Sequence, residues 1–181
     1  MAIATGRPIY YFDESRVDNW CLQARSWSPK YSNNYVVKNT QLWSLTLYGA
    51  LGTEGYVVFG AKGCNSDNLA LFVPVLEKAC GKPNAKGKPF LIVDQHGSHR
   101  KMLSWLSRSF EVLFQAPQSS PFNCVEGLWS FIKREHRQSL AENPLMNRTE
   151  GDFRANLMTI SERVAKANYK GLARGNIRYL E

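Results

Sequence analysis

Hydrophobic residues in the first third of the chain form short runs that predict β-strands. IYYFDE at 9–14 is an apolar run that ends in two carboxylates. LWSLTLYGALG at 42–52 and GYVVFGAKG at 55–63 are two further runs, separated by a tight turn from Gly52 to Gly55. The pattern therefore predicts an antiparallel meander of strands.

Helical and strand patterns alternate in the next part of the chain. Residues 67–80 carry apolar side chains at helical spacing, although Pro74 is expected to kink this helix or to begin a shorter one. PFLIVD at 89–94 is a continuous apolar run, typical of a strand covered on both faces. We expect a helix at about 99–108 and another strand in EVLFQAP at 111–117.

A last helix is predicted at about 150–167, where Thr149 and Asp152 have the spacing of a capping box. Its apolar face consists of Phe153, Leu157, Ile160 and Val164. Three early strands followed by alternating helices and strands indicate an α/β fold, with a mixed sheet and helices on both faces. We expect a single domain over residues 1–181, with a core at about 9–140.

The composition is that of a folded protein without a membrane span. Of the 181 residues, 44% are hydrophobic, and the longest apolar run, LALFVPVL at 69–76, is too short to cross a bilayer. The N-terminus lacks the pattern of a secretory signal, so we expect an intracellular protein with no membrane partner. The four cysteines lack CxxC spacing, which favours free thiols over a zinc site or disulfides.

Basic residues outnumber acidic ones by 23 to 15, giving a formal net charge of +8. This balance favours a polyanionic partner such as nucleic acid, although a generic solvated surface has the same composition. Residues 78–110 carry seven basic residues and one acidic residue. Residues 111–126 carry two acidic residues and no basic ones, so positive charge flanks an acidic island that contains Glu126.

Two acidic residues end apolar strands: Asp13 follows IYYF, and Asp94 follows FLIV. Carboxylates are costly to bury unless they are paired, protonated or bound to a cation. If the two strands are neighbours, both side chains converge at one sheet edge, whereas Glu14 points to the face opposite Asp13. The alternatives are that Asp13 is a turn residue and that Asp94 caps the next helix.

Glu126 lies at the start of a helix that begins near Asn123. The inward stripe of this helix is Val125, Leu128, Trp129, Ile132 and His136. On an adjacent face, Glu126 is followed by Ser130, Lys133 and Arg137, an arrangement that suits a cation site leading into a phosphate track. The spacing of Asn123 and Glu126 also fits a capping box, which by itself explains an acid at this position.

Four segments in this order resemble the DDE endonuclease catalytic domain of Tc1/mariner and IS630-type transposases. FDES at 12–15 resembles the first-acid strand, and SLTLYGAL at 44–51 resembles the second strand. LIVDQHGSH at 91–99 resembles the segment with the second Asp and a following His. APQSSPFNCVEGLWSFIK at 116–133 resembles the proline-rich turn, Asn-x-x-Glu and Trp-x-x-x-Lys signature. The resemblance covers roughly residues 9–137.

The resemblance implies an RNase H-like fold in which Asp13, Asp94 and Glu126 are the catalytic and metal-binding triad. It implies two Mg²⁺ or Mn²⁺ ions, with Asp94 as the bridging ligand, because hard cations prefer oxygen ligands. DNA is the implied partner. The implied activity is that of a DNA endonuclease/transposase, which hydrolyses a phosphodiester and then transfers a 3′-hydroxyl.

Several residues near the triad are candidates for phosphate contacts, which set position rather than sequence. They are His99, Arg100, Lys101, Lys133, Arg134 and Arg137. For His99, a role in orienting water at the metal and a local hydrogen bond at the helix start are also open. A zinc site at His96 and His99 is weak because it lacks nearby cysteines.

The chain departs from the family pattern in three respects. Asp94 and Glu126 are a few residues closer in sequence than is usual, and Gln95 replaces the commoner Asn. The interval between Pro121 and Asn123 is one residue tighter than usual. A domesticated, transposase-derived subunit that binds nucleic acid or protein without catalysis is therefore the alternative function. An RNase H-type ribonuclease ranks lower because it lacks the proline-rich turn.

Only eight residues precede the first strand, so we expect no N-terminal helix-turn-helix module in this chain. DNA recognition then falls to a separate subunit or to a domain that has been removed, and a homodimer is compatible with the sequence. We expect a nuclear protein in a eukaryote and a cytoplasmic one in a bacterium.

Overall fold

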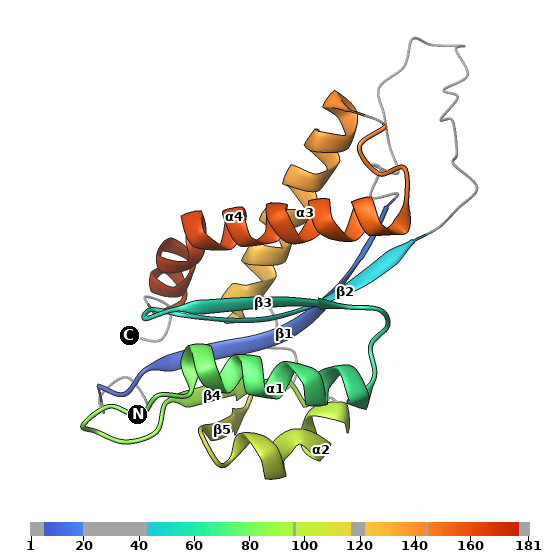
Figure 1. The fold of residues 1–181 in the computed structure, drawn as a ribbon. Coiled ribbons are helices and arrows are strands. Elements are labelled where there is room, and N and C mark those ends of the chain that lie inside the picture. The colour runs from blue at the N-terminus through green and yellow to red at the C-terminus, as the bar shows by residue number, and fades with distance from the viewer. Residues whose placement is uncertain (1–5, 20–42, 96, 117–121, 144, 178–181) are drawn as a thin grey trace.

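The structure, a computed structural model, describes residues 6–19, 43–95, 97–116, 122–143 and 145–177. Its strands are β1 (Ile9–Asp18), β2 (Ser44–Gly52), β3 (Tyr56–Ala61), β4 (Phe90–Val93) and β5 (Glu111–Phe114). Its helices are α1 (Ser66–Cys80), α2 (Gly97–Leu106), α3 (Cys124–Glu142) and α4 (Glu150–Ile177). Figure 1 shows the arrangement of these elements.

The five strands form one mixed sheet in the order β3-β2-β1-β4-β5. β1, β2 and β3 pair antiparallel, and the turn between β2 and β3 is closed by the amide of Gly52, which donates to the carbonyl of Gly55 at 2.9 Å. The predicted meander is therefore confirmed. β4 pairs parallel with β1, and β5 pairs parallel with β4. β1 is thus the central strand.

Helices cover both faces of the sheet, as predicted: α1 and α2 lie on one face, α3 and α4 on the other (Figure 1). β1 contributes side chains to both hydrophobic cores, because successive residues of a strand point to opposite faces of the sheet. Tyr10 and Phe12 pack in the core under α1, and Tyr11 packs in the core under α3 and α4. β1 therefore joins the two halves of the fold.

Helix α1 runs from Ser66 to Cys80 through Pro74, so the alternative of a shorter helix is wrong. A proline inside a helix leaves the carbonyl four residues earlier without its usual N–H donor. Here that carbonyl belongs to Ala70, which is exposed, so water can hydrate it. The apolar face of α1 supplies the packing that holds the helix together across this position.

Helix α4 begins as predicted but continues about ten residues further than the predicted end near 167, to Ile177. Thr149 and Asp152 form the predicted capping box: each backbone amide donates to the other residue's side chain at 3.0 Å. Ala173 is buried near the end of α4, so contacts that sequence periodicity did not reveal extend the helix. None of the described helices is long and apolar enough to cross a membrane.

Helix α3 buries the stripe predicted from its sequence, including a histidine. His136 is 0% exposed, and its ring lies 5.7 Å, centroid to centroid, from the ring of Phe153 on α4. Neither ring nitrogen of His136 has a hydrogen-bond partner within the described part of the chain. Burial lowers the pKa of His136 to about 4, so the ring is neutral at pH 7.

The variant His136→Phe should reduce the acid sensitivity of the fold. Unfolded histidine binds a proton near pH 6.5, whereas buried His136 does so only near pH 4, so stability falls as pH drops through this window. Between pH 7 and pH 5 the wild type should lose about 2 kcal/mol through this residue. Urea unfolding of the wild type and the variant at pH 7 and at pH 5 measures this loss of stability. An equal loss in the two proteins would contradict the assignment.

Candidate active site

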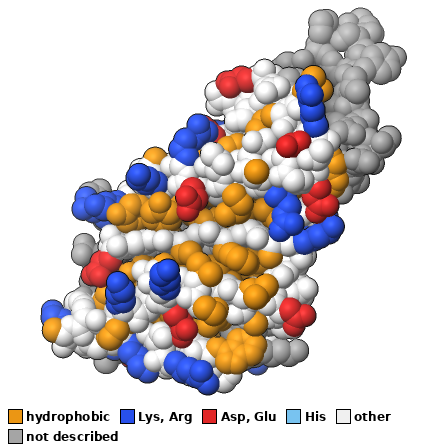
Figure 2. All heavy atoms as spheres, viewed as in Figure 1, with side chains coloured by type: hydrophobic (Ala, Val, Ile, Leu, Met, Phe, Trp, Pro, Cys, Tyr) orange, Lys and Arg blue, Asp and Glu red, His pale blue; other side chains and the backbone are white. Residues whose placement is uncertain are grey.

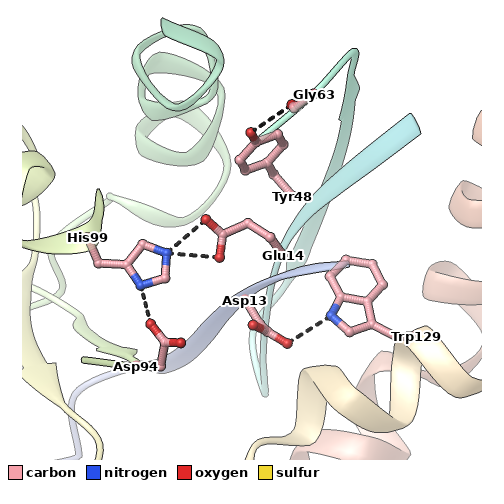
Figure 3. A network of polar contacts seen from close by, with 7 residues as sticks. All are labelled: Asp13, Glu14, Tyr48, Gly63, Asp94, His99 and Trp129. Atoms are coloured by element: carbon pink, nitrogen blue, oxygen red, sulfur yellow. Dashed lines mark hydrogen bonds and ion pairs between the residues drawn. The ribbon is translucent and has the colours of Figure 1, made fainter. Parts of the chain in front are cut away.

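Asp13 lies on the central strand β1, on the face covered by α3. Its carboxylate accepts a hydrogen bond of 3.0 Å from the indole Nε1 of Trp129 (Figure 3). Gly49, the residue opposite Asp13 on β2, makes room for this ring. A Cβ atom at Gly49 would lie 2.5 Å from the Cη2 atom of Trp129. The small residue on β2 therefore allows the indole to reach the carboxylate.

Glu126 lies in the first turn of α3, and its negative charge acts on Asp13. The helix starts at the predicted cap, where the side chain of Asn123 accepts from the amide of Val125 at 3.1 Å. Burial and, second, the negative charge of Glu126 together raise the pKa of the Asp13 carboxyl to about 6, although the hydrogen bond from Trp129 opposes this rise. Two carboxylates from distant parts of the chain therefore lie close enough to repel each other.

Asp94 follows β4 at the same level as Asp13 on β1. The parallel pairing of Tyr11 with Ile92 puts the two acids, each two residues further on, at the same level of the sheet, although only Asp94 follows the end of its strand. The Asp94 side chain is 48% exposed, and its carboxylate forms an ion pair with Nδ1 of His99 on α2 (Figure 3). The prediction that Asp13 ends its strand is wrong, because β1 continues to Asp18 through its pairing with β2. The Asp94 carboxylate points towards His99.

His99 is buried between two carboxylates. Its Nε2 atom lies 2.8 Å from both carboxylate oxygens of Glu14, while Nδ1 faces Asp94. Burial alone would lower the pKa of His99, but the hydrogen bond and charge of Glu14, together with Asp94, outweigh burial and raise it. The side chain of His99 is only 2% exposed, which leaves the predicted phosphate contact without support.

The acidic residues therefore form two groups, near the middle of β1 and just after the end of β4. Asp13 lies near Glu126 on the α3 face, and Asp94 lies with Glu14 and His99. Among the described residues, no three His, Cys, Asp or Glu side chains are placed to hold one metal ion together. The convergence of Asp13, Asp94 and Glu126 on one pocket therefore stays a prediction.

The donor atoms at this sheet edge fit a hard divalent cation. Carboxylate oxygens are the ligands that Mg²⁺ and Mn²⁺ prefer, and Mg²⁺ needs only one or two carboxylates in addition to water. A divalent cation held by these carboxylates would relieve the repulsion between Asp13 and Glu126.

The predicted phosphate contacts on α3 follow Glu126 along the same helix. Arg134 is exposed, while Lys133 and Arg137 are partly exposed. The guanidinium carbon of Arg134 lies 4.9 Å from the ring centroid of Phe131, so this side chain lies along its own helix. These three side chains are accessible to a polyanion, and their contact with DNA stays a prediction.

On α2, Arg100 is exposed, and the side chain of Lys101 lies outside the described residues. On the face shown in Figure 2, Lys and Arg side chains are interspersed with Asp and Glu and do not form one patch. The clustering of positive charge along the sequence therefore does not produce a uniformly basic surface on this face.

Sequence reasoning missed three residues of this site. Trp129 was interpreted as a core residue only, although its indole also holds Asp13. Gly49 carried no signal, because the contact that requires a small residue comes from a distant helix. Glu14 was correctly assigned to the face opposite Asp13, but its contact with His99 was missed. His99 lies five residues after Asp94 in the sequence. The contact between Glu14 and His99 became detectable only when the structure placed α2 on the face of the sheet to which Glu14 points.

The fold is similar to that of solved mariner transposases. The chain in the crystal structure of the Mos1 strand transfer complex matches with a TM-score of 0.51 and 14% sequence identity, covering 93% of this chain and 54% of that chain. The Mos1 paired-end complex with the left transposon end matches with a TM-score of 0.46 and 13% identity, covering 93% and 55%. This chain thus spans about half the length of those chains.

The comparison with Mos1 confirms the predicted RNase H-like fold. A search of curated proteins finds no match. The family comparison covers residues 8–144, which include β1 to β5 and all of α3, and so contains both groups of acids. This is also the region in which the sequence resembles the DDE catalytic domain. The chain therefore belongs to the family described as DDE superfamily endonuclease.

Proposed function

We propose that this chain is the catalytic domain of a metal-dependent DNA endonuclease of the transposase type. It hydrolyses a DNA phosphodiester and transfers the resulting 3′-hydroxyl to a second strand. Membership of the DDE family supports this assignment. The observation that carries it is the Asp13 carboxylate on the central strand, which is bonded to Trp129 of α3 and subject to the charge of Glu126 in the first turn of that helix.

Asp13, Glu126 and Asp94 are the residues that would hold Mg²⁺ or Mn²⁺, and we propose two ions, as the DDE chemistry requires. When bound, such a pair supplies a polarised attacking oxygen and charge stabilisation for the departing oxygen of the phosphodiester. The chain itself offers carboxylate oxygens from β1, α3 and the end of β4. Since β1 and α3 pack in the same hydrophobic core, Asp13 and Glu126 are held on rigid supports.

The residues around the acids have positioning tasks. Trp129 donates to Asp13 and limits the rotation of that carboxylate, and Asn123 fixes the first turn of α3 that carries Glu126. The buried indole also keeps water away from one side of the Asp13 carboxylate. A carboxylate held in this way loses less conformational entropy when it binds a cation.

DNA is the proposed partner of the exposed side of α3. Lys133, Arg134 and Arg137 follow Glu126 along this helix, so they are suited to the phosphates on one side of the scissile bond. Contacts of this kind depend on salt and carry no sequence information.

A second candidate is a binding subunit that retains the fold without catalysis. One observation favours it: in the described residues, Asp94 is engaged with His99 and does not join Asp13 and Glu126 in a metal cluster. The two candidates differ in whether the acidic residues bind divalent metal ions. A measurement of DNA nicking therefore distinguishes them.

The variant Asp94→Asn should abolish the nicking of supercoiled plasmid in Mn²⁺ or Mg²⁺, because the amide cannot serve as an anionic ligand. We expect a loss of at least about 100-fold. Asp18→Asn is the matched control, since Asp18 lies at the far end of β1 and pairs with Arg16 at 3.0 Å. Equal nicking by the wild type and Asp94→Asn would exclude the enzyme and favour the binding subunit.

The variant Asp13→Asn should be more stable than the wild type in EDTA at pH 7. The raised pKa means that ionised Asp13 destabilises the fold above pH 6, and this cost disappears as pH falls towards 3.8. Removing the charge should therefore stabilise the fold by about 1–3 kcal/mol, while the amide oxygen still accepts from Trp129. Urea unfolding measures this difference.

The same pair of proteins tests the metal assignment through stability. Mn²⁺ that binds only the native state raises the free energy of unfolding. We expect a clear rise for the wild type and a much smaller one for Asp13→Asn. The role of Asp13 would be contradicted if Asp13→Asn were less stable than the wild type in EDTA. It would also be contradicted if Mn²⁺ raised the free energy of unfolding of Asp13→Asn as much as that of the wild type.

A further inference from the structure

Glu14 and His99 form a buried polar pair that the predicted triad does not include. The side chain of His99 is 2% exposed and that of Glu14 is 12% exposed. Glu14 follows Asp13 on β1 but points to the opposite face of the sheet, towards α2 (Figure 3). Buried charged groups are retained only where a partner offsets their desolvation, so the placement of this pair demands a reason.

The pair continues into Asp94. Nε2 of His99 faces Glu14 at 2.8 Å, and Nδ1 forms the ion pair with Asp94. Both ring nitrogens of His99 therefore face carboxylate oxygens. Glu14 thereby fixes the orientation of the imidazole, and the imidazole fixes one oxygen of Asp94.

We propose that Glu14 and His99 are positioning residues that set the orientation of the Asp94 carboxylate for divalent metal binding. This inference rests on the proposed function, because it takes Asp94 to be a metal ligand. Glu14 acts through His99 and touches neither metal nor DNA. Groups that hydrogen-bond to metal ligands in this way commonly control metal affinity by 10–100-fold.

The surroundings of the imidazole explain why it can orient Asp94. The ring of His99 packs edge-on against Phe12, with the centroids 5.2 Å apart, so its plane is fixed by the core. Asp94 itself lies just after the last residue of β4 and is 48% exposed, so its own strand restrains it little. A charge-assisted bond from a fixed donor restricts a carboxylate that would otherwise sample several rotamers.

The competing explanation is structural: the pair could simply attach the start of α2 to β1. Both explanations predict that breaking the pair lowers stability, so stability cannot separate them. Only the positioning role predicts a change in metal affinity in a protein that remains folded. Mn²⁺ binding in the absence of DNA is therefore the decisive measurement.

The double variant Glu14→Leu/His99→Leu is designed to keep the fold. Replacing both partners of a buried polar pair by apolar groups is often nearly neutral, whereas removing one leaves the other unpaired. Glu14→Gln, which retains an acceptor for Nε2, is the conservative variant, and Asp18→Asn is the matched surface control.

Electron paramagnetic resonance of free Mn²⁺ gives the dissociation constant for the 181-residue chain without DNA. We expect the double variant to bind Mn²⁺ about 10–100-fold more weakly than the wild type. Glu14→Gln should recover most of the wild-type affinity, and Asp18→Asn should match the wild type. In plasmid nicking, the double variant should need correspondingly more Mn²⁺ for half-maximal rate.

Two results would overturn the inference, and they are distinguishable. If Asp94→Asn abolishes Mn²⁺ binding while the folded double variant binds as the wild type does, Asp94 is a ligand but Glu14 and His99 only stabilise the fold. If Asp94→Asn also binds and nicks like the wild type, the metal function of Asp94 fails, and the inference fails with it.

Discussion

The cost of placing carboxylates on the central strand governs this structure. β1 carries Asp13 and Glu14 side by side, with one side chain on each face of the sheet, and neither is fully hydrated. A carboxylate removed from water must find a donor or a cation, or take up a proton. Asp13 finds the indole of Trp129, and Glu14 finds the imidazole of His99. Each face of the sheet thus contributes one polar contact that crosses its hydrophobic core.

These two contacts tie the helices to the strand that carries the acids. Trp129 belongs to α3, and its packing requires the absence of a side chain at Gly49 on β2. His99 belongs to α2 and packs against Phe12 of β1. The sheet and both helix layers therefore define the position of the acids together. A core built in this way is specific as well as stable, because a shift of either helix leaves a buried polar group without its partner.

The same arrangement accounts for a conflict between stability and function. Asp13 near Glu126 is unfavourable in the protein alone, as its raised pKa indicates, yet this repulsion is what a divalent cation relieves. Functional sites often retain such unfavourable groups, since the ligand that completes the site offsets their cost. The second group differs, because the imidazole of His99 lies between the carboxylates of Asp94 and Glu14. The two halves of the proposed site thus differ in how much they need a metal ion.

The sequence by itself determined the secondary structure, the fold class and the family. Apolar runs and helical periodicity act locally, so the meander, the buried stripe of α3 and the capping box of Thr149 and Asp152 were predictable. The passage of α1 through Pro74 and the length of α4 were not, because packing overrode the local signals. Only the tertiary structure decided that Asp94 engages His99, that Glu14 takes part, and that Trp129 holds Asp13. These contacts join residues from separate elements, and their geometry depends on how the helices pack on the sheet, which no local pattern encodes.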